Sequence, residues 1–295
     1  MDSKISVVIP AYNEEEAIGE TIAEVRSTLE GMELDAYQIV VVDDGSTDRT
    51  GKIAEQYGAD VVRHPSNGGY GISLKDGIAR ATHDAIVIMD ADGTYPASKI
   101  PLIYEIYEEG FDMVVGAREG EHYDESFFKS ILRCLLRWLV EFSSGRGVPD
   151  INSGLRIFSK KTILSYYDVL CNTFSFTTSL TLAYAMTGRF IGYTPIPYGK
   201  RRGKTKVRLF RDSLKTLQFV LEAILYFNPI KIFLLLTSIV LLFSFINLVI
   251  AALTKLAIAY ILGVGSILVA LLIFSLGLVA IILSKAARVK YKPYQ

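Results

Sequence analysis

The chain has 295 residues, with 31 lysines and arginines against 31 aspartates and glutamates, so its formal net charge at pH 7 is zero. This length allows one or two domains, and the balanced charge argues neither for nor against a nucleic-acid ligand. Nucleic acid is not among the expected partners. The two cysteines, Cys134 and Cys171, have no metal-ligand spacing and are interpreted as reduced packing residues.

The N-terminal half alternates short apolar runs with amphipathic segments. The first nine residues contain no long apolar core or cleavage site, so we expect no signal peptide and a cytosolic start. The alternation predicts an α/β fold with a mostly parallel sheet and helices on both faces. The predicted strands are 5–10, 38–44, 60–63, 85–89 and 112–118, a loop at 150–154 leads into a further strand up to 158, and 190–198 is another extended piece. The predicted helices begin near 17, 48, 70, 100 and 126.

The run 85–92 is the most informative stretch, because a buried strand ends there in two carboxylates, Asp90 and Asp92. Ligands of open α/β sheets bind beyond the carboxyl ends of the strands. Two close carboxylates favour a cation between them, and hard oxygen ligands suit Mg²⁺ or Mn²⁺ holding a diphosphate. The alternative is a simple strand end followed by a surface turn, and the rest of the chain has to decide between the two.

The glycines at 69 and 71 do not form a dinucleotide-binding motif. Leu74 stands where that motif needs a third small residue, and the run follows the third predicted strand rather than the first. A tight turn into a helix is the simpler role.

The C-terminal third predicts membrane attachment. A basic run at 199–215 leads into, and overlaps the start of, an amphipathic helix at 209–229. Such a helix suits the membrane interface. The stretches 232–254 and 256–284 lack charges and are long enough to span a bilayer. Basic residues flank both outer ends, so we expect both termini and the catalytic part in the cytosol. The predicted domains are 1–208, 209–229 and 230–295.

Seven motifs together resemble the family 2 inverting glycosyltransferases of the GT-A (Rossmann-like) fold, and within them the dolichyl- and polyprenyl-phosphate glycosyltransferases. The resemblance covers residues 5 to about 210 in order and spacing. Its motifs are VIPAYNEE (8–15), VVDDGSTD (41–48), NGG (67–69), MDAD (89–92), GAR (116–118), DINSG (150–154) and RGKTK (202–206).

The resemblance implies roles for the matching positions. The base, ribose and diphosphate of the nucleotide would be bound by Pro10, Tyr12, Asn13, Glu14, Asp43, Asp44, Asp90 and Ala91. The divalent metal would be held by Asp90, Asp92 and Thr94, where Thr94 replaces the glutamine of the mannose synthases. The catalytic group would be Asp92, Arg118 and Asp150, and the acceptor phosphate would meet Ser153, Arg202 and Lys206. Lys129 and Arg133 share one helical face, and either hold this phosphate or form a solvated face.

The predicted reaction transfers a monosaccharide, with inversion, from a nucleotide sugar to a polyprenyl or dolichyl phosphate at the cytosolic membrane face. The alternative is a membrane glycosyltransferase that extends a glycan or glycolipid, and a third interpretation is a membrane-tethered nucleotide-binding protein without activity. GDP-mannose, UDP-glucose and UDP-N-acetylglucosamine all remain open as donors, as does assembly into a homo-oligomer.

Overall fold

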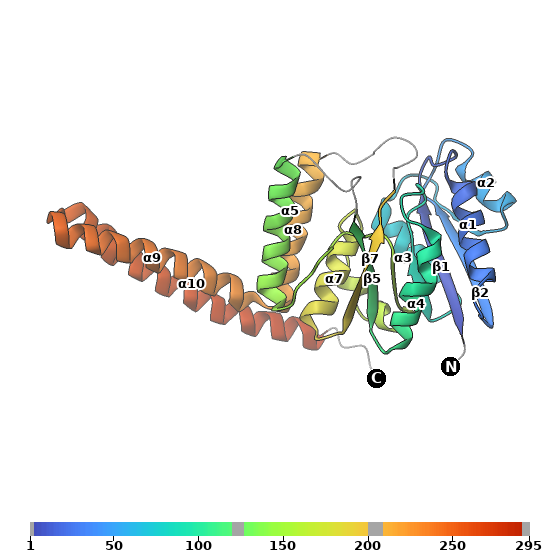
Figure 1. Cartoon of the computed structure of the whole chain (residues 1–295). Coiled ribbons are helices and arrows are strands. Elements are labelled where there is room, and N and C mark those ends of the chain that lie inside the picture. Colours follow the sequence, from blue (N-terminus) through green and yellow to red (C-terminus); the bar gives the residue numbers. More distant parts are fainter. Residues whose placement is uncertain (1–2, 120–126, 200–208, 291–295) are drawn as a thin grey trace. The chain divides into compact units, whose positions relative to one another are not determined.

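The computed structural model describes residues 3–119, 127–199 and 209–290. A seven-stranded sheet has the order β3-β2-β1-β4-β6-β5-β7 (Figure 1). Its strands are β1 (Lys4–Ala11), β2 (Ala36–Asp43), β3 (Asp60–Arg63), β4 (Ala85–Ile88), β5 (Met113–Glu119), β6 (Arg156–Ser159) and β7 (Ile191–Pro197). The helices are α1 (Ile18–Glu30), α2 (Thr50–Gln56), α3 (Tyr70–Arg80), α4 (Ile100–Glu108), α5 (Phe127–Ser144), α6 (Lys160–Leu164), α7 (Phe176–Met186), α8 (Leu209–Phe227), α9 (Pro229–Thr254) and α10 (Ala257–Lys290).

The sheet is mostly parallel, as predicted, with one exception. β6 lies between β4 and β5 and runs antiparallel to both. The loop that precedes β6 therefore lies at the same edge of the sheet as the carboxyl ends of β4 and β5. This reversal brings the DINSG motif at 150–154 to the edge where the Asp90–Asp92 motif ends a strand.

Helices cover both faces of the sheet, and each face has its own apolar core. Ile22 of α1 and Ile103 of α4 pack in the first core, whereas Leu74 of α3 and Leu180 of α7 pack in the second. The central strands are buried from both sides, which explains why they read as continuous apolar runs in the sequence.

Helix α7 is absent from the sequence prediction. Ten of its eleven residues are buried, so it shows no alternation of apolar and polar faces. It also contains three threonines, Thr177, Thr178 and Thr181, which favour strands over helices. Its burial in the fold, rather than its local sequence, stabilises it as a helix.

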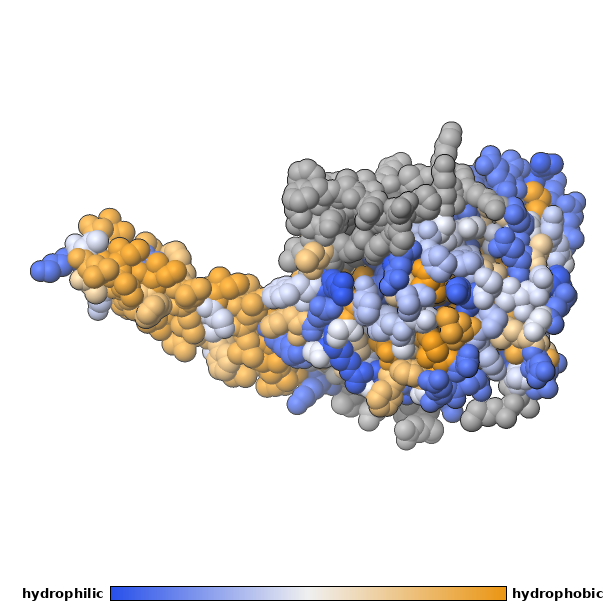
Figure 2. All heavy atoms as spheres, viewed as in Figure 1, coloured by the Kyte–Doolittle hydropathy of each residue, from blue (hydrophilic) through white to orange (hydrophobic). Residues whose placement is uncertain are grey.

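The chain forms two compact units, one of residues 1–141 and 146–220 and the other of residues 142–145 and 221–295. The second unit contains α9 and α10, two helices long and apolar enough to cross a membrane. They form a hairpin around Lys255, which adopts a left-handed conformation with φ 59°. The Ser244 hydroxyl donates to the Gly263 carbonyl of the facing helix over 2.6 Å. Figure 2 shows the largely apolar surface of this hairpin.

Candidate active site

The candidate site lies at the carboxyl ends of β1, β2 and β4. β1 pairs with β2 on one side and β4 on the other, and both pairings are parallel. In the β1–β2 register Ala11 stands opposite Asp43, so the two strands end together. The ends of these three strands and the loops after them carry the predicted nucleotide and metal residues, and doubly wound sheets bind their ligands beyond such carboxyl ends.

Asn13 locks the loop after β1 to the loop after β2. Its main chain has a φ of 50°, a conformation that asparagine tolerates better than most residues. The Asn13 amide N–H donates to Ser46 Oγ over 3.0 Å, and its side-chain oxygen accepts from the Thr47 N–H over 2.8 Å. Next to it, the Glu14 N–H donates to Thr50 Oγ1 over 2.8 Å. The side-chain oxygen of Asn13 therefore supports the loop structure, while Pro10 is buried within β1.

Asp43 and Asp44 both bind main-chain donors. Asp43 Oδ1 accepts from the Ser46 N–H over 3.0 Å and shapes the turn after β2. Asp44 accepts from the N–H groups of Gly68 and Gly69, each over 2.8 Å, and so holds the turn that begins α3. Each carboxylate thus fixes one of the loops that border the site.

His64 is a site residue that sequence reasoning missed. Its Nδ1 lies 2.7 Å from Asp44 Oδ1, and its Nε2 lies 3.1 Å from Asp76 Oδ2. The imidazole therefore lies between two carboxylates directly after β3 and is hydrogen-bonded to Asp44 through Nδ1. A lone histidine in a loop carries no sequence signal for this contact, because the contact depends on β3 lying beside β2 and on α3 packing against them.

Asp92 is nearly buried, with 4% of its surface exposed. The Thr94 hydroxyl donates to Asp92 Oδ1 over 2.6 Å, and the Thr94 N–H donates to the same oxygen over 3.1 Å. Gly93 between them has a φ of 72°, which lets the chain turn here. Thr94 thus orients Asp92 in this structure, as an outer-shell partner of a metal ligand does.

Two residues from other segments, Tyr70 and Gly154, lie against the Asp90 carboxylate. Tyr70 Oη donates to Asp90 Oδ1 over 2.8 Å. Burial, and then the neighbouring Asp90 carboxylate, raise the pKa of Tyr70 well above its ordinary value, so the hydroxyl keeps its proton. Gly154 lies against the same carboxylate, and a Cβ at this position would stand 2.5 Å from Asp90 Oδ2. The Gly154 N–H donates to Tyr95 Oη over 2.6 Å.

Arg118, which is partly exposed, and the buried Asp150 form a bidentate ion pair. The Arg118 Nε and Nη2 atoms donate to the two Asp150 oxygens over 2.7 and 2.9 Å. Burial acts to raise the pKa of Asp150, but the hydrogen bonds and the charge of Arg118 outweigh it, and the pKa lies below its ordinary value. The Arg118 guanidinium also lies 5.4 Å from the centre of the Tyr198 ring. Asp150 is therefore ionised at neutral pH and holds Arg118 at the edge of the sheet.

Ser153 and four basic residues were predicted to bind the acceptor phosphate, and of their side chains the structure describes only that of Ser153. Ser153 is fully buried, and its hydroxyl donates to the Gly116 carbonyl over 2.5 Å, so in this structure it fastens the 150–154 loop to β5. Lys129 and Arg133 lie on α5, but their side chains are outside the described part of the chain, and Arg202 and Lys206 lie outside the described residues altogether.

The acidic residues fit a divalent cation that is shared with a substrate. No cluster of three or more histidine, cysteine or acidic side chains converges within the described residues. Asp90 and Asp92 nevertheless offer hard carboxylate oxygens at the ligand-binding edge, with Ala91 buried between them. Mg²⁺ is commonly bound by one or two carboxylates together with substrate phosphates, and this donor set matches that pattern.

A family model decides the classification, since residues 6–166 match the glycosyl transferase family 2 model. The chain belongs to glycosyl transferase family 2. This confirms the resemblance that the ordered motifs indicated. The match covers the strands and loops that form the candidate site, from β1 through the DINSG loop and β6.

Curated relatives of this family member include two proteins of Haloferax volcanii. A dolichyl-phosphate hexose transferase is 31% identical over 70% of this chain and 87% of its own length. A low-salt glycan biosynthesis hexosyltransferase is 33% identical over 74% of this chain and 53% of its own length. An undecaprenyl-phosphate 4-deoxy-4-formamido-L-arabinose transferase of Enterobacter is 30% identical, and this chain covers 56% of it. The chain thus spans just over half of the last two relatives.

Solved structures confirm the GT-A fold. Glucosyl-3-phosphoglycerate synthase from Mycobacterium tuberculosis, in complex with phosphoglyceric acid, has a TM-score of 0.62 at 23% identity, covering 75% of this chain and 80% of that one. The same enzyme in complex with Mn²⁺, UDP-glucose and phosphoglyceric acid has a TM-score of 0.61 at 22% identity, with the same coverage.

Proposed function

We propose that this glycosyltransferase transfers a hexose from a nucleotide sugar to a polyprenyl phosphate at the cytosolic face of a membrane, with inversion at the anomeric carbon. The observation that carries the proposal is the joining of two groups at one edge of the sheet. Asp90 and Asp92 follow β4, Arg118 near the end of β5 pairs with Asp150 of the loop before β6, and Gly154 of that loop lies against the Asp90 carboxylate.

The reaction forms a bond between the acceptor phosphate oxygen and the anomeric carbon and breaks the bond from that carbon to the nucleoside diphosphate. The leaving group accumulates negative charge as the bond breaks, so fixed positive charge at this point lowers the barrier. Arg118 supplies positive charge beside this point, at the acceptor phosphate, and Asp150 fixes its orientation. A bound divalent cation, held by Asp90 and Asp92, would add Lewis-acid stabilisation of the diphosphate.

Asp150 holds Arg118 rather than removing a proton from the acceptor. A phosphate monoester is already largely a dianion above about pH 6, so the nucleophile needs no strong base. The pKa of Asp150 lies below its ordinary value, which also makes it a weak base. A sugar hydroxyl acceptor would need proton removal, so this ion pair favours a phosphate acceptor over glycan extension.

The nucleotide side of the site is formed by the loops after β1 and β2. We assign Tyr12, Glu14, Asp43 and Asp44 to the nucleotide pocket, with Asn13 and Ser46 holding its two loops together. The metal would be shared by Asp90 and Asp92, with Thr94 orienting Asp92.

The membrane hairpin fits a lipid acceptor. A polyprenol stays in the bilayer, so its phosphate is presented at headgroup level, where basic segments concentrate. The basic residues at 199–215 and at 285–292 flank the two apolar helices and favour a cytosolic catalytic unit with both termini on that side. In this topology Lys129, Arg133, Arg202 and Lys206 are the cations that we assign to the lipid phosphate.

The test is to incubate the purified full chain with labelled UDP-hexoses and GDP-mannose, Mg²⁺ or Mn²⁺, and polyprenyl phosphate. We expect one donor to label an organic-soluble product. Label that appears only in a water-soluble glycan, or in a glycolipid formed without polyprenyl phosphate, would contradict the proposal.

A further inference from the structure

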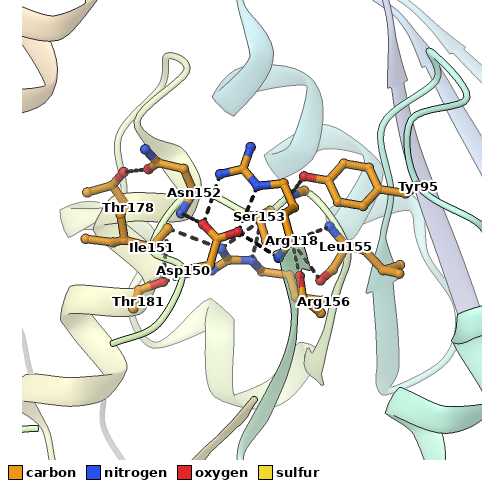
Figure 3. A network of polar contacts seen from close by, with 12 residues as sticks. Tyr95, Arg118, Asp150, Ile151, Asn152, Ser153, Leu155, Arg156, Thr178 and Thr181 are labelled. Carbon is orange, nitrogen blue, oxygen red and sulfur yellow. Dashed lines mark hydrogen bonds and ion pairs between the residues drawn. The ribbon is translucent and has the colours of Figure 1, made fainter. Parts of the chain in front are cut away.

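Arg156 is the largest fully buried side chain among the described residues, with no measurable surface exposed. It is the first residue of β6, directly after the DINSG loop. All five N–H groups of its guanidinium are bonded, as Figure 3 shows for most of its partners. Nε donates to the Ser153 carbonyl (3.0 Å), Nη2 to the carbonyls of Ser153 (2.8 Å) and Ile151 (3.3 Å), and Nη1 to the Thr177 carbonyl (3.1 Å) and Thr181 Oγ1 (2.9 Å).

These acceptors are uncharged, and among the described residues no carboxylate forms an ion pair with Arg156. Burying a guanidinium without a bonded counter-ion is costly, and the burial lowers the pKa of Arg156. An apolar side chain of similar size would fill the same space without that cost. A buried arginine at this position therefore needs an explanation beyond packing.

The hydrogen bonds of Arg156 connect two segments that meet only in the folded chain. Ile151 and Ser153 belong to the loop that presents Asp150 to Arg118. Thr177 and Thr181 belong to the first turns of α7. The planar fork of an arginine reaches both sets at once, which neither lysine nor an apolar residue can do. The loop is thus fastened to a helix that is buried on all sides.

We propose that Arg156 is a positioning residue for the acceptor side of the reaction, because it fixes the 150–154 loop so that Asp150 holds the Arg118 guanidinium toward the acceptor phosphate. This inference rests on the proposed function of the Arg118–Asp150 pair. The nucleotide loops after β1 and β2 receive none of the five hydrogen bonds of Arg156, so its effect falls on turnover rather than on nucleotide binding.

The test compares the full-length wild type with Arg156→Lys, which keeps the positive charge but loses the fork. We expect kcat for transfer to polyprenyl phosphate to fall about 10- to 100-fold, the range expected when a catalytic group is misplaced by up to 1 Å. UDP or GDP affinity should stay within about twofold, as for sites without shared partners. Amide hydrogen exchange over residues 151–155 should become faster than in the wild type.

A second pair of variants covers the case in which Arg156→Lys does not fold. Thr181→Val removes one acceptor from Arg156 and should lower kcat about fivefold, the factor of one ordinary hydrogen bond. Thr187→Val, at the C-terminal end of the same helix, leaves the Arg156 contacts intact and should keep wild-type kcat.

Three results would overturn the inference. These are a wild-type kcat in Arg156→Lys, a parallel loss of nucleotide affinity and kcat, and a Thr181→Val variant that is indistinguishable from Thr187→Val. If the wild type itself transfers no sugar to polyprenyl phosphate, the proposed function fails. In that case unchanged exchange over 151–155 in Arg156→Lys would separately reject the role of Arg156 in holding the loop.

Discussion

The proposed nucleotide side and the proposed acceptor side of this site are held together by different physical means. On the nucleotide side, short polar side chains such as Asn13 and Asp44 bind main-chain N–H groups of neighbouring loops. On the acceptor side, two arginines make the contacts: Arg118 is bidentate to Asp150, and Arg156 donates three hydrogen bonds to the 150–154 loop and two to α7. Hydrogen bonds among short side chains tolerate small changes, whereas an arginine fork loses its geometry in any replacement. We therefore expect substitutions on the two sides to have different kinetic signatures.

The largest effect is expected where the two sides meet, at Asp92. In Asp92→Asn the carboxylate charge is lost, and transfer should fall about 100- to 1,000-fold, the usual loss for one electrostatic contact to the reacting group. Transfer activity at increasing Mn²⁺ concentration measures the loss, and circular dichroism checks that the variant is folded. Asp112→Asn, whose carboxylate pairs with Arg189 instead, should keep its activity. An active, folded Asp92→Asn variant would remove the metal role.

The acceptor side is tested by Arg118→Lys. Lysine keeps the charge but cannot donate two parallel bonds to Asp150, so kcat should fall about 100-fold while nucleotide affinity is unchanged. Arg80→Lys is the matched control, because Arg80 makes a similar two-bond contact with Asp60 on the exposed surface. Equal losses in the two variants would show that the ion pair has no special role.

The contact between the two sides is tested at Gly154. A Cβ added here would lie 2.5 Å from Asp90 Oδ2, so Gly154→Ala must displace that carboxylate. We expect about tenfold weaker Mn²⁺ binding in the presence of UDP or GDP, as measured by electron paramagnetic resonance. Gly147→Ala, with nothing within 4 Å of the added Cβ, should bind Mn²⁺ as the wild type does. Unchanged Mn²⁺ binding in Gly154→Ala would show that Gly154 does not connect the acceptor side to the Asp90 carboxylate.

The nucleotide side is tested at His64. His64→Gln shortens the side chain that is hydrogen-bonded to Asp44, so the donor KM should rise about fivefold, the factor of one ordinary hydrogen bond, with kcat unchanged. His83→Gln, at the opposite edge of the sheet, is the control. A fall in kcat at constant donor KM would contradict the assignment of His64 to the nucleotide side of the site.

The pH dependence gives the smallest expected effect. The pKa of Asp150 is lower in the folded chain than its ordinary value of 3.8, so its ion pair stabilises the fold at pH values above 3.8. That stabilisation is lost as the pH falls through the lower, folded-state value. The difference in unfolding midpoint between wild type and Asp150→Asn should therefore be constant above about pH 5 and shrink below about pH 4. A difference that already shrinks between pH 7 and 5 would contradict the ion pair.

The strands and the family were predictable, because apolar runs and ordered sequence motifs are local signals. Asp90 and Asp92 could be placed at a ligand-binding edge from the strand before them. The antiparallel direction of β6 could not be predicted, since it depends on pairing with β4 and β5. Arg156 gave no signal either, because a charged residue normally predicts a surface position and only the folded chain supplies its five acceptors. His64 and α7 were missed for the same reason, since tertiary contacts rather than local sequence determine them.

The most direct measurement compares two lipid acceptors that differ only in the phosphate. The purified chain, given its labelled donor and Mn²⁺, should form an organic-soluble labelled lipid with polyprenyl phosphate and none with the corresponding polyprenol. Equal labelling of the polyprenol would contradict phosphate as the nucleophile, and labelling of neither lipid, with the donor bound, would contradict a lipid acceptor.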